Sequence, residues 1–140
     1  MDSIKRREIM MKHYQDPINR GLIEDERYRS SHANHESCID HIDIMMLIEN
    51  DTIQDIRFEA EACAIVISST SIMIEALMNK TKDEALSILN EYKKMINKEE
   101  CDEKMVRDLI VYSDIYKQPN RIFCASLSAD LIIDILNQKS

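Results

Sequence analysis

The residues best suited to chemistry in this sequence are its four cysteines, Cys38, Cys63, Cys101 and Cys124. No two of them are spaced as C-x-x-C, which argues against a zinc ribbon and a thioredoxin-like redox motif. The N-terminal residues lack an apolar signal segment, and no apolar run approaches the length that spans a membrane. We therefore expect reduced, cytoplasmic thiols that are available to metal or sulfur chemistry.

Cys63 is expected at the junction between a strand and a helix. Apolar residues near a period of two predict a strand over 52–58, and apolar positions that wrap most of a helix follow from Cys63 to Met78. Unpaired N–H groups at the start of a helix favour a thiolate. This place suits a metal ligand or a sulfur nucleophile. The alternative is a small buried hydrophobic residue that caps an apolar helix.

Cys38 and Asp40 form a Cys-x-Asp sequence in a segment, Cys38 to Glu49, whose pattern predicts a strand. Strand alternation places these two side chains on one face of the strand and His41 on the other. The pair suits two metal ligands that project together. The alternative is an exposed acid beside a half-buried cysteine.

Cys124 is expected in the first turn of the last helix, which the pattern starts near Asn120. Arg121 lies three residues before Cys124, so its guanidinium can lie close to the same thiolate. A cationic neighbour and a helix N-terminus both stabilise a thiolate. Cys124 is therefore a second candidate of the same kind as Cys63.

The candidate ligands converge on one type of metal site. Cys38, Cys63 and Cys124 supply three sulfur ligands and Asp40 supplies one oxygen, a set that suits tetrahedral zinc. Cys101 lies in a polar connector between two predicted helices, where we expect an exposed thiol without a role.

The rest of the pattern predicts the elements that must hold these residues. The strand from Cys38 and the strand over 52–58 form a hairpin around Asn50-Asp51, with an edge strand near 27–33. Thr81 and Glu84 have the spacing of a capping box that opens a helix. Further helices are expected over 2–14 with Ser3 as N-cap, over 105–112, and in the last segment.

Length and composition limit the class of protein. The chain has 140 residues, enough for one domain over 1–140 with a real core. Its net charge of −8 argues against a general binder of nucleic acid or of anionic membranes. With one glycine, the chain has no glycine-rich phosphate loop of the Walker or Rossmann type.

Four segments, in order and spacing, resemble one family. His13-Tyr14-x-x-Pro17-x-Asn19-Arg20-Gly21 resembles its N-terminal signature, and Cys38-x-Asp40 resembles its C-G-D motif. Cys63-Ala64-Ile65 resembles its G-C-A-I-S segment, and Arg121 to Leu127 resembles its R-x-x-C-A-x-L motif. The family is that of the iron–sulfur cluster assembly scaffolds, IscU, SufU and the N-terminal part of NifU.

Two features of this resemblance favour the SufU branch. IscU proteins have a lysine and a histidine where this chain has Ile122 and Phe123. The long interval between Cys63 and Cys124 accommodates the additional helical segment of SufU proteins, at about residues 98–118. The chain also departs from the family, because Ile39, Ala60 and Ala62 stand where the family has glycines, which tolerate backbone angles that these residues resist.

The resemblance implies an α+β fold, with a small antiparallel sheet of about three strands packed against several α-helices. It implies zinc held by Cys38, Asp40, Cys63 and Cys124, and Cys38 as the acceptor of persulfide sulfur from a pyridoxal-phosphate cysteine desulfurase. Arg121 would offset the negative charge of the site. Such a protein is a sulfurtransferase-like partner of the desulfurase rather than a stand-alone enzyme, and it supplies downstream iron–sulfur assembly proteins.

Two other readings remain. An IscU-type scaffold would assemble a [2Fe–2S] cluster on the same residues. A structural zinc protein would have a closed, inert site, whereas a catalytic site keeps an exchangeable position. In each reading we expect no nucleic-acid partner and no membrane partner.

Overall fold

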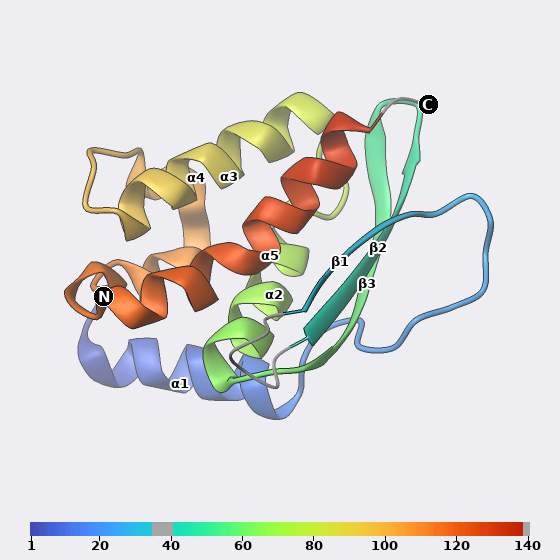
Figure 1. The fold of residues 1–140 in the computed structure, drawn as a ribbon. Coiled ribbons are helices and arrows are strands. Elements are labelled where there is room, and N and C mark those ends of the chain that lie inside the picture. The colour runs from blue at the N-terminus through green and yellow to red at the C-terminus, as the bar shows by residue number, and fades with distance from the viewer. Residues whose placement is uncertain (35–40, 139–140) are drawn as a thin grey trace.

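The computed structural model describes residues 1–34 and 41–138. Its sheet contains β1 (Arg29–Asn34), β2 (His41–Glu49) and β3 (Thr52–Glu61), all antiparallel and in the order β1-β2-β3. The helices gather on one side of this sheet (Figure 1). This arrangement confirms the predicted α+β fold with a small antiparallel sheet.

Two helices lie against the sheet, α2 (Ala64–Leu77) and α5 (Pro119–Asn137). Two more pack outside them, α1 (Ser3–Gln15) on α2 and α3 (Lys82–Ile96) on α5 (Figure 1). Short helical pieces connect α3 to α5, namely α4 (Glu103–Val106), η1 (Arg107–Tyr112) and η2 (Ile115–Lys117). The segment between α3 and α5, which lies between Cys63 and Cys124 in the sequence, therefore packs against the other helices.

The β2–β3 hairpin forms as predicted. Asn50 and Asp51 both have positive φ, 53° and 63°, which is the backbone of a two-residue type I′ turn, and Asn and Asp tolerate it. Glu49 pairs with Thr52 across this turn. β3 continues to Glu61, three residues beyond the predicted strand, because its last residues still pair with the start of β2.

The starts of α3 and α1 show how well local sequence signals predict the residue that caps a helix. Thr81 and Glu84 form the predicted capping box at α3: the Thr81 hydroxyl accepts from the Glu84 N–H, and the Glu84 carboxylate accepts from the Thr81 N–H. The expected N-cap of α1 is wrong by one position. Asp2 caps the helix instead of Ser3, with its carboxylate accepting from the N–H of Lys5.

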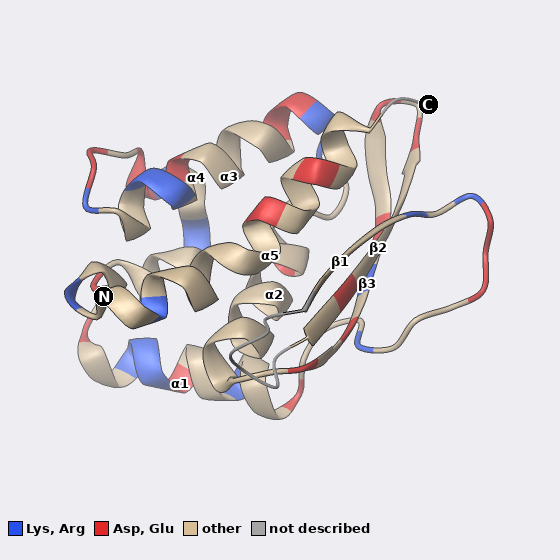
Figure 2. Ribbon diagram, viewed as in Figure 1, with Lys and Arg blue, Asp and Glu red and all other residues tan. Residues whose placement is uncertain are grey.

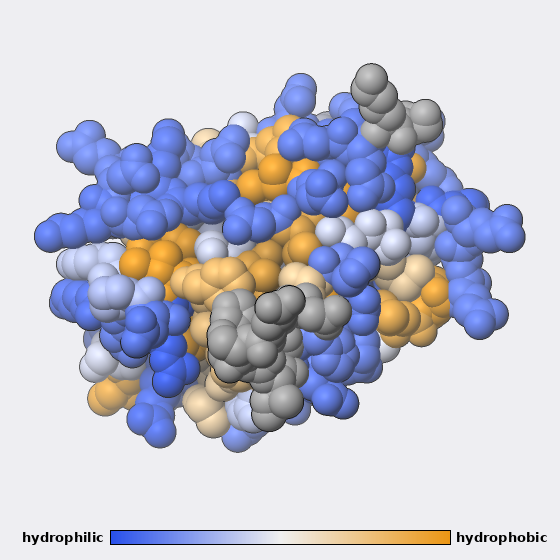
Figure 3. Space-filling model, in the orientation of Figure 1, coloured by the Kyte–Doolittle hydropathy of each residue, from blue (hydrophilic) through white to orange (hydrophobic). Residues whose placement is uncertain are grey.

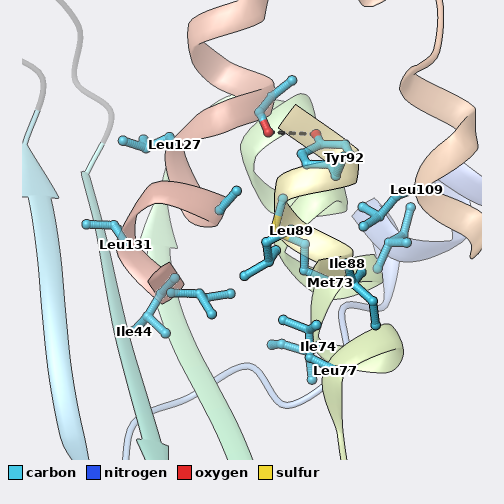
Figure 4. Close-up of a cluster of buried hydrophobic side chains, with 14 of the residues drawn as sticks. Ile44, Met73, Ile74, Leu77, Ile88, Leu89, Tyr92, Leu109, Leu127 and Leu131 are labelled. Atoms are coloured by element: carbon cyan, nitrogen blue, oxygen red, sulfur yellow. Dashed lines mark hydrogen bonds between the residues drawn. The ribbon is translucent and has the colours of Figure 1, made fainter. Parts of the chain in front are cut away.

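The core lies between the sheet and the helices. One face of β2 and β3 buries Ile42, Ile44, Met46, Ile56 and Phe58 completely. Figure 4 shows how Ile44 meets α2, α3 and α5 through a cluster of buried side chains, including Met73, Ile74, Leu77, Leu89, Tyr92, Leu127 and Leu131. Burial of this apolar surface is the main force that fixes α2 and α5 on the sheet.

A buried polar run interrupts this core. Ser68, Ser69, Thr70 and Ser71 of α2 are all buried, and each needs a hydrogen-bond partner. Ser68 bonds to Tyr112 of η1, Thr70 bonds to Ser128 of α5, and Ser71 bonds to His13 of α1. The run therefore joins α2 to three different elements.

Charges of both signs cover the surface. Figure 2 shows acidic and basic residues interspersed along the helices and the sheet. Among the described residues, no helix is both long enough and apolar enough to cross a membrane.

His13 is a buried titratable group in the helical layer, and its surroundings predict a pH effect on stability. Its Nδ1 lies 2.7 Å from the Ser71 hydroxyl, and the side chain is almost inaccessible. Burial lowers the pKa of His13 below its ordinary value of 6.5; Glu75 and Asp108 oppose this shift and Lys12 adds to it. Because the folded pKa is the lower one, the unfolded chain binds this proton first as pH falls.

We therefore expect the free energy of unfolding to decrease below pH 6.5, more steeply in the wild type than in His13→Asn, which lacks the titrating ring. Urea unfolding in a chelator, from about pH 7.5 down to about pH 5.5, measures this difference. His32→Asn, at an exposed position of β1, is the matched control. Equal slopes for the wild type and His13→Asn would contradict the prediction.

Candidate metal centre

Cys63 lies at the junction between β3 and α2, as predicted. It is the N-cap of α2, with an extended backbone at φ −67° and ψ 165°, and its carbonyl accepts the first helical bond from Ile67. Its thiol is half-buried and makes no capping hydrogen bond to the first turn of α2. The sulfur therefore sits at the positive end of the α2 dipole, beside the unpaired N–H groups of the first turn.

Cys124 lies in α5, but not in the first turn as predicted. The helix begins at Pro119, because proline suits the first helical position, and Cys124 falls in the second turn. Arg121 is exposed one turn before Cys124, and Phe123 is 47% exposed beside it. Cys124 itself is half-buried and packs against the core. The helix N-terminus thus contributes less to the Cys124 sulfur than to Cys63.

The packing of α2 on α5 relates the two cysteine-bearing helices. Thr70 and Ser128 hydrogen-bond across this contact. Cys63 lies about two helical turns before Thr70, and Cys124 lies about one turn before Ser128. Both cysteines therefore belong to the same packed pair of helices.

One end of the sheet also meets the start of α2. Asn34, the last residue of β1, pairs with His41, the first of β2, and His41 pairs with Glu61, two residues before Cys63. Cys38 and Asp40 belong to 35–40, outside the described residues, so the prediction that they share a face opposite His41 is not tested. Within 1–34 and 41–138, no three His, Cys, Asp or Glu side chains form a metal-binding group.

Two buried tyrosines, Tyr92 and Tyr112, contact the two cysteine-bearing helices. Burial is the main cause that raises the pKa of Tyr112, and the charge of nearby Cys63 adds to the rise. Burial likewise raises the pKa of Tyr92 well above 10.0, with Tyr112 adding to the effect. Both hydroxyls are therefore protonated near neutral pH and can donate hydrogen bonds.

Cys101 is half-buried, which corrects the expectation that it is exposed. The connector after α3 folds back, and Cys101 packs against the edge of the core. Burial raises the pKa of its thiol, and the charges of Glu103, Glu91 and Asp102 raise it further. Cys101 is thus a protonated thiol near neutral pH, unlike a metal ligand.

The comparisons with known proteins identify the family. The family described as "NifU-like N terminal domain" matches residues 5–125. The chain belongs to this family. It is 32% identical over 123 residues to the zinc-dependent sulfurtransferase SufU of Bacillus subtilis, an alignment that covers 87% of this chain and 82% of the relative.

Other members of the NifU-like family are similarly related. The iron–sulfur cluster assembly scaffold protein IscU of Thermotoga maritima is 29% identical over 121 residues, covering 86% of this chain and 84% of the relative. The crystal structure of FiSufU from Fervidobacterium islandicum superimposes with a TM-score of 0.84 at 30% identity, covering 93% of this chain and 95% of that one. The fold and the family assignment therefore agree.

The alanines that replace family glycines fit their positions. Ala60 is fully buried in β3, and Ala62 is half-buried between β3 and α2. Neither has a positive φ, so neither position requires the conformational freedom of glycine. The third replacement, Ile39, lies outside the described residues.

The N-terminal signature of the NifU-like family contacts the end of β3 that leads to Cys63. The sequence pattern alone does not reveal this role. Asn19, with φ 55°, and Gly21, with φ 116°, let the chain run beside β3, where the Gly21 N–H donates to the Phe58 carbonyl. Arg20 donates to the Glu59 carboxylate and the Ala60 carbonyl. The only sequence signal for these contacts between residues 19–21 and β3 is the signature itself.

Proposed function

We propose that this protein is a SufU-type sulfur relay: it accepts sulfane sulfur from the persulfide of a pyridoxal-phosphate cysteine desulfurase and passes it to iron–sulfur assembly proteins. The observation that carries the proposal is the position of Cys63 as the N-cap of α2. It lies two residues after Glu61, which pairs with His41 at the end of the sheet where β1 ends and β2 begins. The 32% identity to a zinc-dependent sulfurtransferase supports it. We place the protein in the cytoplasm, where thiols stay reduced.

The ligands would be Cys38, Asp40, Cys63 and Cys124. Asp40 directly precedes His41 in the sequence, and His41 pairs with Glu61, two residues before Cys63. The donor chemistry fits zinc, because three thiolates and one carboxylate match its preferred ligands. Zinc bound there would keep the thiolates deprotonated near neutral pH.

The rest of the chain presents this site to a protein partner. Arg121 and Phe123 are exposed on the same turn of α5 that leads into Cys124. The face drawn in Figure 3 exposes apolar surface across its middle below a hydrophilic band, a pattern that suits protein contacts. We take residues 1–140 as one domain, since a shared core joins the sheet to α1, α2, α3 and α5.

An IscU-type scaffold is the second candidate function. The 29% identity to IscU of Thermotoga maritima, over nearly the same share of the chain, favours it. In that case iron and sulfide would be cargo on the same residues. Ile122 and Phe123, in place of the lysine and histidine of IscU proteins, favour the relay instead.

Metal analysis of protein purified without added metal tests the proposal. We expect about one zinc per chain, little iron, and faster turnover of cysteine by the desulfurase when the protein is present. Iron with acid-labile sulfide and visible absorption would replace the relay with the scaffold function. Neither metal, and no effect on the desulfurase, would contradict both.

Arg121 has a specific role in this proposal: its guanidinium would offset the negative charge of the site and contact the partner. Its exposure implies that Arg121→Ala leaves the melting temperature unchanged while it weakens stimulation of the desulfurase. Arg7→Ala, at an exposed position of α1, is the control. Equal losses of stability and stimulation in Arg121→Ala would indicate a structural role.

A further inference from the structure

Tyr92 and Tyr112 are the two largest fully buried side chains of the core. Tyr92 comes from α3, and Tyr112 ends η1, within the segment between the cysteines. Their rings meet edge to face, with centroids 6.4 Å apart and an interplanar angle of 80°. Because this is a favoured geometry for aromatic rings, each tyrosine restrains the other.

Each hydroxyl is linked, directly or through one serine, to the backbone carbonyl of the residue that follows a candidate ligand. Tyr92 donates to the carbonyl of Ala125, the residue after Cys124, at 2.6 Å (Figure 4). Tyr112 bonds to Ser68, and the Ser68 hydroxyl donates at 2.7 Å to the carbonyl of Ala64. Because a serine hydroxyl has one proton, Tyr112 must be the donor in its bond to Ser68.

These contacts form a continuous path between the two cysteine-bearing helices. It runs from the first residue of α2, through Ser68, Tyr112 and Tyr92, to the residue after Cys124. The side chains of Ser68, Tyr112 and Tyr92 are fully buried or nearly so, whereas the path reaches exposed Ala64 only through its backbone carbonyl. A buried path of this kind resists changes in the distance and orientation between the two helices.

We propose that Tyr92 and Tyr112 act as a pair of positioning residues that set the placement of Cys63 relative to Cys124 for metal binding. The inference rests on the proposed function, because it assumes that both cysteines bind the same metal. Thiolate–zinc bonds are about 2.3 Å long with tetrahedral angles, so small displacements of one sulfur weaken the site. Groups that orient metal ligands from behind commonly change metal affinity by about tenfold to a hundredfold when removed.

The alternative is that the two tyrosines only fill the core and satisfy their hydroxyls. Tyr→Phe substitutions separate the two roles, because they keep the rings and remove only the hydrogen bonds. Tyr28→Phe is the matched control, because its hydroxyl donates to Asp55 of β3, a residue that is not part of this path. Loss of a hydrogen bond lowers stability in all three variants, whereas only loss of positioning alters the metal site.

The experiment measures zinc affinity by competition with a chromophoric chelator, and the absorption spectrum of the Co²⁺-substituted protein, whose band intensities report tetrahedral thiolate coordination. We expect Tyr92→Phe and Tyr112→Phe each to weaken zinc binding about tenfold and to change the Co²⁺ spectrum, with Tyr28→Phe unchanged. The double variant should lose less than the product of the single losses, because the pair acts as a unit. Melting temperatures confirm that each variant folds.

Two outcomes would overturn the proposal, and they differ in what else they affect. If both Phe variants lose stability but match Tyr28→Phe in zinc affinity and Co²⁺ spectrum, the positioning role is wrong and the relay function stands. If the wild-type protein binds neither Zn²⁺ nor Co²⁺, the shared metal site is wrong, and the proposed function falls with it.

Discussion

Cys63→Ser is expected to lose most of its zinc without losing its fold. A serine hydroxyl is not deprotonated near neutral pH and is a poor ligand for zinc compared with a thiolate. The same change suits the local backbone, because position 63 is the N-cap of α2 and serine is a preferred N-cap residue. Cys63 makes no capping bond that the substitution could break.

The two effects therefore have opposite signs and can be separated. In a chelator, the free energy of unfolding of Cys63→Ser, measured with denaturant, should equal that of the wild type or exceed it by up to about 1 kcal/mol. Elemental analysis of the purified variant should show most of the zinc gone. Cys101→Ser should keep all of it, because the raised pKa of Cys101 keeps that thiol protonated. Full zinc retention in Cys63→Ser would show that the ligand assignment is wrong.

The parts of this fold that are predictable from sequence are those with local causes. The capping box at Thr81 and the hairpin turn at Asn50-Asp51 each depend on a few adjacent residues whose chemistry has one favourable arrangement. Cys63 is predictable for the same reason, since a change of hydrophobic period marks the end of β3 and the start of α2. Where two residues suit one role, as Asp2 and Ser3 do for the cap of α1, local signals leave an error of one position.

The parts that local reasoning misses depend on distant partners. β3 extends to Glu61 because β2 pairs with it, and Cys101 is half-buried because its connector folds back onto the core. The polar run from Ser68 to Ser71 is another example: its partners come from α1, η1 and α5, which no periodicity of α2 predicts. The support behind the candidate site is therefore a property of the fold rather than of the motifs.

Cys38→Ala is expected to abolish sulfur acceptance while the fold survives. Cys63 and Cys124 are fixed by α2 and α5, both packed into the core, so moving either sulfur toward a partner would disturb that packing. In the sequence, Cys38 belongs to neither α2 nor α5. Of the three proposed sulfur ligands, it can therefore take part in transfer at the least cost to the core.

The transfer is a thiol–persulfide exchange that needs no external oxidant or reductant. In the proposed transfer, the Cys38 thiolate would attack the sulfane sulfur of the desulfurase persulfide; a new S–S bond would form at Cys38 as the old S–S bond breaks. The desulfurase cysteine leaves as a thiolate, and the transferred sulfane sulfur keeps its proton, so that Cys38 ends as a persulfide, S–SH. A thiolate is required at Cys38, which is why the acceptor belongs in a metal-ligand set that favours deprotonation.

Mass spectrometry after incubation with desulfurase and cysteine should find one added sulfur on the Cys38 peptide of the wild-type protein. Cys38→Ala should show none, and its melting temperature in a chelator should match that of the wild type, because the substitution changes no residue of α2 or α5. Cys101→Ala, which removes the half-buried thiol of the connector after α3, should accept sulfur normally. Persulfide found on Cys124 alone would overturn the assignment of Cys38, and it would favour the IscU-type mechanism on the same residues.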